Sequence, residues 1–151
     1  PTIADDSGLM VDALNGEPGI YSARFGGARN KTDRDRLQYL LERMQGVPQE
    51  RRSAKFVSVI TLLTPDGRQV TARGECPGRI LTEPDGSVPG FDGMFCGGEN
   101  GFGYDPVFYV SEQGCTFAEL PAAEKNRISH RARALAAFAE KVKKENLYVN
   151  E

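Results

Sequence analysis

Two adjacent carboxylates, Asp5 and Asp6, lie near the start of the sequence and are followed by Ser7 and Gly8. Mg²⁺ is held by oxygen ligands, and one or two carboxylates suffice when phosphates and water complete its shell. A carboxylate beside a metal-bound or free water can also accept the proton of that water. The same residue types favour a turn at a strand end, because Asp and Ser bond to nearby backbone and Gly permits a turn. The pattern alone leaves both interpretations open.

A second cluster is the glycine-rich stretch GFGYDP at 101–106. Glycines such as Gly103 allow backbone amides to approach a ligand closely, and Phe102 or Tyr104 can stack on a flat base. Asp105 can accept hydrogen bonds from the N–H groups of such a ring. A glycine turn with two core aromatic residues has the same composition, so this stretch by itself does not establish a binding site.

The third cluster is the basic stretch KNRISHR at 125–131, which leads into the last predicted helix. With Ser129 as N-cap, His130 and Arg131 fall in the first turn, where free amides and the helix dipole favour an anion. Cations at this end destabilise a helix, so their presence, with Lys125 nearby, indicates a negatively charged ligand. For a lone histidine the alternative is a stacked surface residue. The three clusters together predict an enzyme that acts on a nucleotide phosphate.

Regular elements are expected to position these clusters. An apolar stripe from Leu37 to Met44 at helical spacing, with Thr32 or Asp33 as N-cap, predicts a helix, and a second stripe that includes Leu135 predicts another. Intermixed helices and strands predict an α/β or α+β fold with a mixed sheet. The other expected elements are strands at 1–4, 54–63, 68–76 and 106–110, an apolar element at 9–14, a turn at 65–67, a glycine-rich loop at 83–103, and the last helix at 129–144.

The composition limits the class of protein. The chain has 151 residues, of which 39% are hydrophobic and 26% are charged, as expected of one globular domain. Its formal charge of −2 gives no basic field for a nucleic-acid polymer or an anionic membrane, and no apolar stretch predicts a membrane span. The three cysteines show no metal-ligand spacing and are interpreted as reduced thiols of a cytoplasmic protein.

Three blocks of the sequence resemble a known family. The segments ADDSGLMVDALNGEPGIYSARF, GFGYDPVF and TFAELPAAEKNRISHRARAL are similar to the signature blocks of the inosine triphosphate pyrophosphatase family, in the same order. The resemblance covers nearly the whole chain. It implies Mg²⁺-dependent hydrolysis of non-standard purine nucleoside triphosphates (ITP, dITP and XTP) to the monophosphate and pyrophosphate, a house-cleaning activity on the nucleotide pool.

The resemblance also implies roles for individual residues. Asp6 resembles the general base and metal ligand of the family, with Asp5 beside it as a second carboxylate near the Mg²⁺ ion. The substrate-contacting positions that it implies are Ser7, Phe102, Gly103, Tyr104, Asp105, Lys125, His130 and Arg131. The implied fold is an elongated mixed sheet with helices, in two lobes around a nucleotide cleft, and the implied assembly is a homodimer.

The sequence departs from the family pattern in two places. The family has a Ser/Thr-x-Asn-x-x-Lys phosphate loop and a glutamate metal ligand before the ADDSG block, whereas this sequence begins at the strand before Asp5. We therefore expect a single domain over 1–151, shortened at its N-terminus relative to the family, with a glycine-rich loop insertion at 83–100. The alternative function is that of a catalytically weakened or inactive relative that serves as a nucleotide-binding or interaction module.

Overall fold

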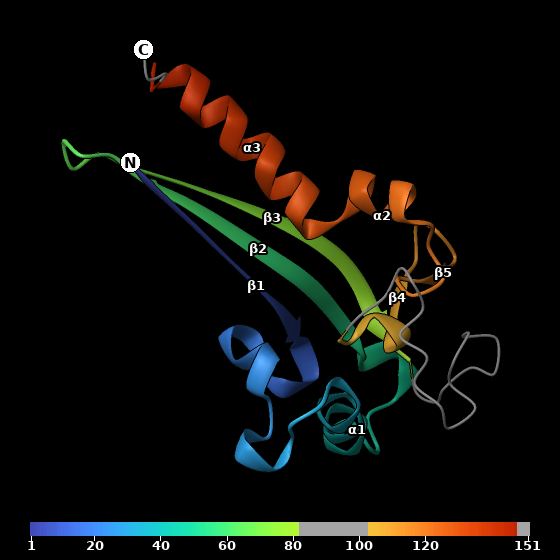
Figure 1. Ribbon diagram of the computed structural model, residues 1–151. Helices are drawn as coiled ribbons and strands as arrows, with labels where there is room; N and C mark the ends of the chain where they lie inside the picture. Colours follow the sequence, from blue (N-terminus) through green and yellow to red (C-terminus); the bar gives the residue numbers. More distant parts are fainter. Residues whose placement is uncertain (82–102, 148–151) are drawn as a thin grey trace.

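The computed structural model describes residues 1–81 and 103–147, and Figure 1 shows their arrangement. Three long strands make up most of a curled sheet, with one long helix along the strands and another across one of their ends. The elements are β1 (Thr2–Val11), η1 (Asp12–Leu14), η2 (Gly19–Arg24), η3 (Gly27–Arg29), α1 (Asp33–Arg43), η4 (Gln49–Arg51), β2 (Ser53–Leu63), β3 (Gln69–Ile80), η5 (Asp105–Val107), β4 (Phe108–Val110), β5 (Cys115–Thr116), α2 (Ala122–Ile128) and α3 (His130–Lys144).

The sheet has the strand order β1-β2-β3-β4-β5. The fold class is confirmed, since a sheet and flanking helices make up the described chain. All the strand pairings among these residues are antiparallel, where the sequence suggested mixed strand directions. β2 lies between β1 and β3, so both of its edges are hydrogen-bonded; one of its faces is buried throughout, and the other is only partly covered.

Strand β1 is longer than the sequence indicated. It runs from Thr2 to Val11 without interruption, so Asp5, Asp6 and Ser7 lie within a regular strand that pairs with β2. The interpretation of these residues as a turn at a strand end was therefore wrong. Their pairing with β2 provides the local backbone order that a turn would otherwise have had to provide. Residues 9–11 of the expected element at 9–14 are the end of this strand, and residues 12–14 form the short helix η1.

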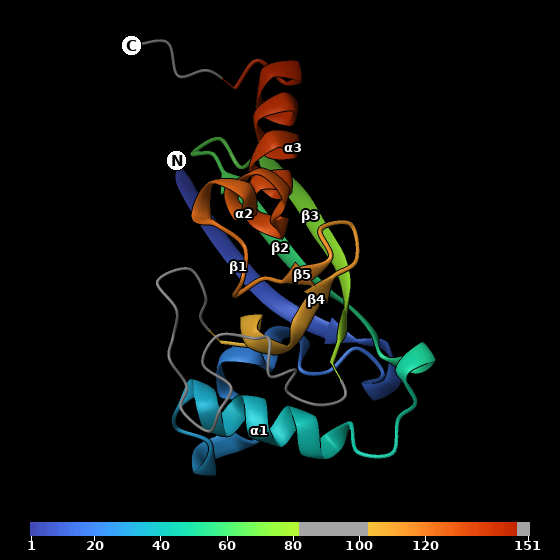
Figure 2. The same ribbon diagram turned by 90° about the vertical axis from the view of Figure 1, so that its right-hand side faces the viewer.

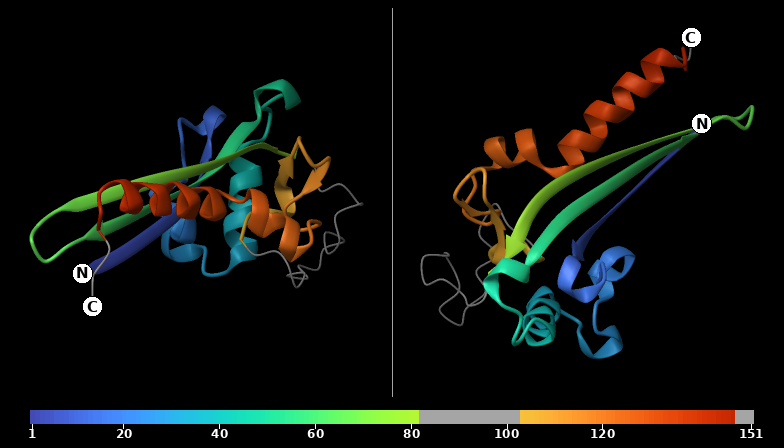
Figure 3. Two further views of the ribbon diagram at one scale, coloured as in Figure 1. Left: turned by 90° about the horizontal axis from the view of Figure 1, so that it is seen from above. Right: turned by 180° about the vertical axis from the view of Figure 1, so that it is seen from behind.

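The two longest helices take different positions on the sheet. Figures 2 and 3 show α3 along the strands and α1 across the other end, beside the short helices of the N-terminal third. Helix α3 packs directly on β3, because a Cβ added to Gly74 would lie 2.3 Å from the carbonyl oxygen of His130 and 2.2 Å from the amide nitrogen of Ala134. A glycine is required at this contact for the helix backbone to approach the sheet.

Most of the buried apolar residues belong to one hydrophobic core. Its centre is an aromatic cluster in which Phe56 contacts Phe108 and Phe117, with ring centroids 4.5 and 5.5 Å apart. Leu37 and Leu40 of α1 belong to the same core. A smaller cluster lies at the other end of the strands, under α3. Among the described residues, no helix combines the length and apolar character that crossing a membrane requires.

A buried arginine joins two parts of the core. The side chain of Arg52 is almost fully enclosed and its guanidinium donates to the carbonyl oxygens of Met44, Val47, Ile80 and Leu81 at 2.8–3.1 Å. Burial lowers the pKa of this guanidinium from its usual value. These bonds tie the end of α1 to the end of β3 and so hold the helix end of the molecule against the sheet.

Candidate active site

A cavity of about 790 Å³ lies between two groups of helices. One wall comes from η2 and α1, the other from α2 and α3, and β1 and the residues before β4 complete it. The structure brings together all the substrate-contacting residues predicted within the described part of the chain; Phe102 lies outside that part. Those in the lining are Ser7, Gly103, Tyr104, Asp105, Lys125, His130 and Arg131.

The first turn of α3 forms one wall of the cavity. Ser129 caps this helix, as predicted, because its Oγ accepts a hydrogen bond from the Ala132 amide at 3.2 Å. The cap places the next two residues, His130 and Arg131, in the cavity wall. Arg131 reaches across to β1, where its Nε donates to Ser7 Oγ at 3.4 Å. The basic cluster thus meets the DDSG segment, from which it is 124 residues distant in sequence.

The imidazole of His130 is largely buried and stacks on Phe56, with ring centroids 5.0 Å apart. Burial, with smaller contributions from the charges of Arg131 and Lys125, lowers the pKa of His130 to about 4. Its Nδ1 is buried and has no hydrogen-bond partner among the described residues. The ring is therefore neutral at pH 7 and offers a hydrogen bond and a flat face, not the positive charge that the sequence suggested.

Asp105 and Lys125 form a close ion pair in the cavity wall. The Lys125 Nζ lies 2.5 Å from Asp105 Oδ2, and the carboxylate side chain is only 6% exposed. Lys125 comes from the short helix α2, which the sequence did not predict, and its ammonium also lies over the Phe117 ring, 5.4 Å from the centroid. An ammonium beside a carboxylate presents both donors and acceptors to a ligand, which is what the edge of a purine requires.

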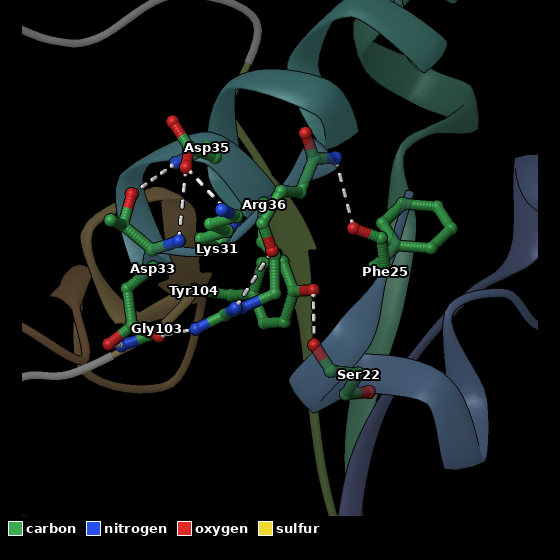
Figure 4. Close-up of polar contacts among 10 residues, drawn as sticks. Ser22, Phe25, Lys31, Asp33, Asp35, Arg36, Gly103 and Tyr104 are labelled. Carbon is green, nitrogen blue, oxygen red and sulfur yellow. Dashed lines mark hydrogen bonds and ion pairs between the residues drawn. The ribbon is translucent and has the colours of Figure 1, made fainter. Parts of the chain in front are cut away.

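Tyr104 packs into the cavity wall beside α1, as Figure 4 shows. Its hydroxyl donates to the Ser22 carbonyl oxygen at 2.7 Å, and burial raises its pKa to about 12. The phenol therefore stays protonated at physiological pH. Gly103, which precedes it, has φ +64°, a conformation that favours glycine. The described part of the glycine-aromatic stretch is therefore a tight turn that also lines a cavity, and its role in binding a base stays a prediction.

Three polar lining residues lie outside the predicted clusters and were not expected from the sequence: Ser22, Asp33 and Arg36. Ser22 Oγ accepts from the Leu9 amide at 2.9 Å, so it fastens η2 to β1. The same close approach explains Gly8, where an added Cβ would lie 2.3 Å from the Gly19 carbonyl oxygen. The position of Ser22 in the SAR segment of the first signature block was the only signal that could have pointed to it.

Asp5 and Asp6 lie on the exposed edge of β1, just before the cavity. Successive side chains of a strand alternate, so Asp5 shares its face with Ser7, and Asp6 shares the opposite face with Gly8. Ser7 and Gly8 line the cavity, whereas the two aspartates do not. Asp6 Oδ1 accepts from the Ser7 amide at 2.9 Å. Within the described residues, no group of three or more His, Cys, Asp or Glu side chains is placed to hold a metal ion.

The fold and the cavity define a class: an antiparallel sheet with helices around a largely apolar cavity that also contains charged and aromatic side chains. Comparison with known proteins makes the class specific. The model of the Ham1 family matches residues 1–141, and the chain belongs to this family. The resemblance drawn from the three sequence blocks is confirmed.

Several relatives support this assignment. A dITP/XTP pyrophosphatase of Thermus thermophilus is 51% identical over 143 residues, which are 95% of this chain and 62% of the relative. One of Shouchella clausii is 47% identical over 140 residues, which are 93% of this chain and 64% of the relative. The chain thus spans slightly less than two thirds of the length of these curated relatives.

Solved structures agree with the fold. The Ham1 protein of Staphylococcus aureus superposes with a TM-score of 0.79 at 41% identity, covering 95% of this chain and 67% of that one. A HAM1 protein of Coxiella burnetii gives a TM-score of 0.78 at 40% identity, covering 94% of this chain and 66% of that one. The curled sheet with its helices is therefore the fold of this family.

Proposed function

We propose that this chain hydrolyses non-standard purine nucleoside triphosphates, such as dITP, ITP and XTP, to the monophosphate and pyrophosphate. Relatives named dITP/XTP pyrophosphatase, about half identical to it, support the proposal. The observation that carries it is the convergence of three sequence segments, far apart in the chain, on one cavity of about 790 Å³. The segments are the strand β1, which carries the two carboxylates, the glycine-aromatic turn before β4, and the basic start of α3.

The base half of the substrate is assigned to the wall formed by Tyr104, Lys125 and His130. A neutral imidazole and an ammonium can both donate to the 6-oxo group of hypoxanthine or xanthine. Adenine has an amino group at this position, so its N–H groups would meet donors and be rejected. Arg131, at the start of α3, is the cation placed to bind phosphate, where it acts together with the free amides of the helix.

The phosphate half is assigned to the β1 edge. Asp5 and Asp6 are exposed carboxylates, and neither lies within ion-pairing distance of a cation in the described chain. Because they point to opposite faces of β1, one of them, Asp6 in this proposal, would supply the carboxylate of a Mg²⁺ site that substrate phosphates and water complete, with Asp5 beside it. When bound, the ion supplies positive charge to the phosphate oxygens. The Asp6 carboxylate accepts the proton of the water that attacks the α-phosphorus, and pyrophosphate leaves.

The remaining expectations extend this proposal. The shared hydrophobic core supports a single domain, whereas the loop insertion expected at 83–100 lies outside the described residues. A homodimer is proposed from the family resemblance. A cytoplasmic location is proposed because the cysteines show no disulfide or metal-ligand spacing. No nucleic-acid polymer or membrane is proposed as a partner, because the net charge is slightly negative.

The test is pyrophosphate release from ITP with Mg²⁺, compared between the parent chain, Asp6→Asn and Asp5→Asn. We expect Asp6→Asn to abolish hydrolysis, while binding of inosine monophosphate and the circular dichroism spectrum stay unchanged. Asp66→Asn, an exposed carboxylate in the β2–β3 turn, is the matched control and should behave as the parent. Turnover by Asp6→Asn within a few-fold of the parent would show that another group is the base. Binding without turnover in the parent would favour a nucleotide-binding module.

A further inference from the structure

The turn at 103–105 is held at three consecutive residues by three different elements. Helix α1 binds the backbone amide of Gly103, and η2 binds the hydroxyl of Tyr104, as Figure 4 shows. Helix α2 binds the carboxylate of Asp105 through an ion pair. The contacts are Gly103 N–H to Asp33 Oδ2 at 3.2 Å, Tyr104 hydroxyl to Ser22 O at 2.7 Å, and Lys125 Nζ to Asp105 Oδ2 at 2.5 Å.

The contact from α1 uses both oxygens of one carboxylate. Asp33 Oδ2 accepts the Gly103 amide, and Asp33 Oδ1 pairs with Arg36 Nη2 at 2.6 Å. Arg36 Nη1 in turn donates to the Asn30 carbonyl oxygen at 3.2 Å, and its side chain is only 16% exposed. The guanidinium is thus fixed at both ends of its fork and sets the direction in which the Asp33 carboxylate points.

Gly103 needs such an anchor because its own backbone does not restrict it. A Cβ at this position would meet no atom within 4 Å, so the residue is glycine for its φ of +64° and not for lack of space. Glycine occupies positive and negative φ with similar ease. A change of φ here would reorient Tyr104 and Asp105, the next two residues, both of which line the cavity. A hydrogen bond from the Gly103 amide to a fixed carboxylate selects one of these backbone conformations.

We propose that Asp33, held by Arg36, is a positioning residue for nucleotide binding: it fixes the 103–105 turn in the orientation that faces the purine. This rests on the proposed function, because the purine is its ligand. Asp33 acts from the opposite wall of the cavity, 70 residues away in sequence from the amide that it holds. It therefore also joins the α1 end of the molecule to the base-binding wall.

A purely structural role for Asp33 has to be separated from this one. Asp33 is the first residue of α1, where a carboxylate stabilises a helix through the dipole. Thr32 provides a matched control at the same helix end. Its Oγ1 accepts from the Asp35 amide at 3.1 Å as part of a capping box, and it makes no contact with Gly103 in the hydrogen bonds described. Thr32→Ala therefore weakens the same helix start without releasing the turn.

The first measurement is amide hydrogen exchange of Gly103 by NMR in the ligand-free chain. In Asp33→Ala we expect exchange at Gly103 to be about 10-fold faster than in the parent, because the acceptor is lost. Asp33→Asn keeps an acceptor oxygen and should give an intermediate rate, which also covers the case in which the alanine variant folds poorly. Thr32→Ala should leave the Gly103 rate within about twofold of the parent. Unchanged exchange in both Asp33 variants would overturn the anchoring role.

The second measurement is the Kd for inosine monophosphate by calorimetry. We expect Asp33→Ala to weaken binding about 10-fold, equivalent to about 1.4 kcal/mol, with Thr32→Ala within about twofold of the parent. Equal weakening by the two variants would reduce Asp33 to a helix-stabilising residue. A parent chain that binds no inosine nucleotide would refute the proposed function, and with it the purine as ligand. The exchange rates would still show separately whether Asp33 holds the turn.

Discussion

The titration of His130 is the most direct test of the site electrostatics. It is the only histidine in the chain, so an imidazole signal needs no assignment. The folded ring has a pKa of about 4, because it is buried and lies near the charges of Arg131 and Lys125. An unfolded chain has the ordinary histidine pKa of about 6.5. The change to apply is therefore a fall in pH from 7 towards 4.

The sign follows from the order of the two pKa values. Below pH 6.5 the unfolded chain takes up a proton that the folded chain excludes, so the free energy of unfolding decreases as the pH falls. The stability that His130 contributes is complete above pH 6.5 and is lost as the pH falls from 6.5 towards 4. The full difference corresponds to about 3 kcal/mol. Because the ring borders the cavity and is partly solvated, we expect a loss of roughly 1–3 kcal/mol.

The assay combines two measurements. Proton NMR of the imidazole C2–H gives the folded pKa directly, and urea unfolding at pH 7, 6 and 5 gives the stability. Carboxylates also titrate near the lower end of this range, so His130→Phe, which keeps an aromatic ring against Phe56, serves as the reference. The difference in pH dependence between parent and variant isolates the histidine. A C2–H titration centred near 6.5, or parallel stability curves for the two proteins, would refute the assignment of a buried neutral ring.

Three further predictions concern stability. Lys125→Met should lower the free energy of unfolding by about 3 kcal/mol, because it removes the ammonium that pairs with the buried Asp105 carboxylate. Adding Asp105→Asn should recover part of this loss, as measured by urea unfolding. A double variant no more stable than the single one would contradict this prediction. Arg52→Lys should lower the free energy of unfolding by about 2 kcal/mol, because an ammonium cannot reach all four carbonyl oxygens. Arg51→Lys, at the exposed neighbouring residue, is the control and should leave the urea midpoint unchanged. Gly74→Ala should cost roughly 1–3 kcal/mol in thermal unfolding by forcing α3 off the sheet, and an unaltered Tm would show that the contact yields freely.

Elements with a strong local signal were predicted well from the sequence. Helix α1 was expected from its apolar stripe, and the structure confirms Thr32 as its cap and Leu37 and Leu40 as its buried residues. Strand β2 was expected at 54–63 and extends by one residue, to Ser53. In both cases the residues that make the pattern also make the core contacts, so periodicity and burial agree.

Elements that depend on distant contacts were not predicted. Helix α2 has seven residues and no apolar stripe, and strand β5 has two residues, so neither carries a periodic signal. In α3, Leu135 was expected in the buried stripe but is 58% exposed. The contact with β3 is made instead by Ala134, because only a small residue allows the helix backbone to approach Gly74.

The candidate site was predicted as three separate clusters, and their chemistry was easier to infer than their geometry. The charges of Lys125 and Arg131 were visible in the sequence, whereas the neutral state of His130 depends on burial that no local pattern encodes. Asp33 and Ser22 were missed for the same reason. Each contacts the 103–105 turn from 70 or more residues away in sequence. Asp33 binds a backbone amide and Ser22 binds through its own backbone carbonyl, so the residue types do not reveal either contact.

The wide sequence separation of the cavity walls has a consequence for folding. The β1–β2–β3 ladder joins neighbouring strands, but the cavity closes only when Ser7 meets Arg131, 124 residues away, and Asp33 meets Gly103. Long-range contacts of this kind form late, because closing large loops costs entropy before it gains contacts. A nucleotide that binds in this cavity, as proposed, would bind the completed fold and stabilise it relative to partly folded chains. At a ligand concentration 100 times Kd, this linkage adds about 2.7 kcal/mol to the free energy of unfolding.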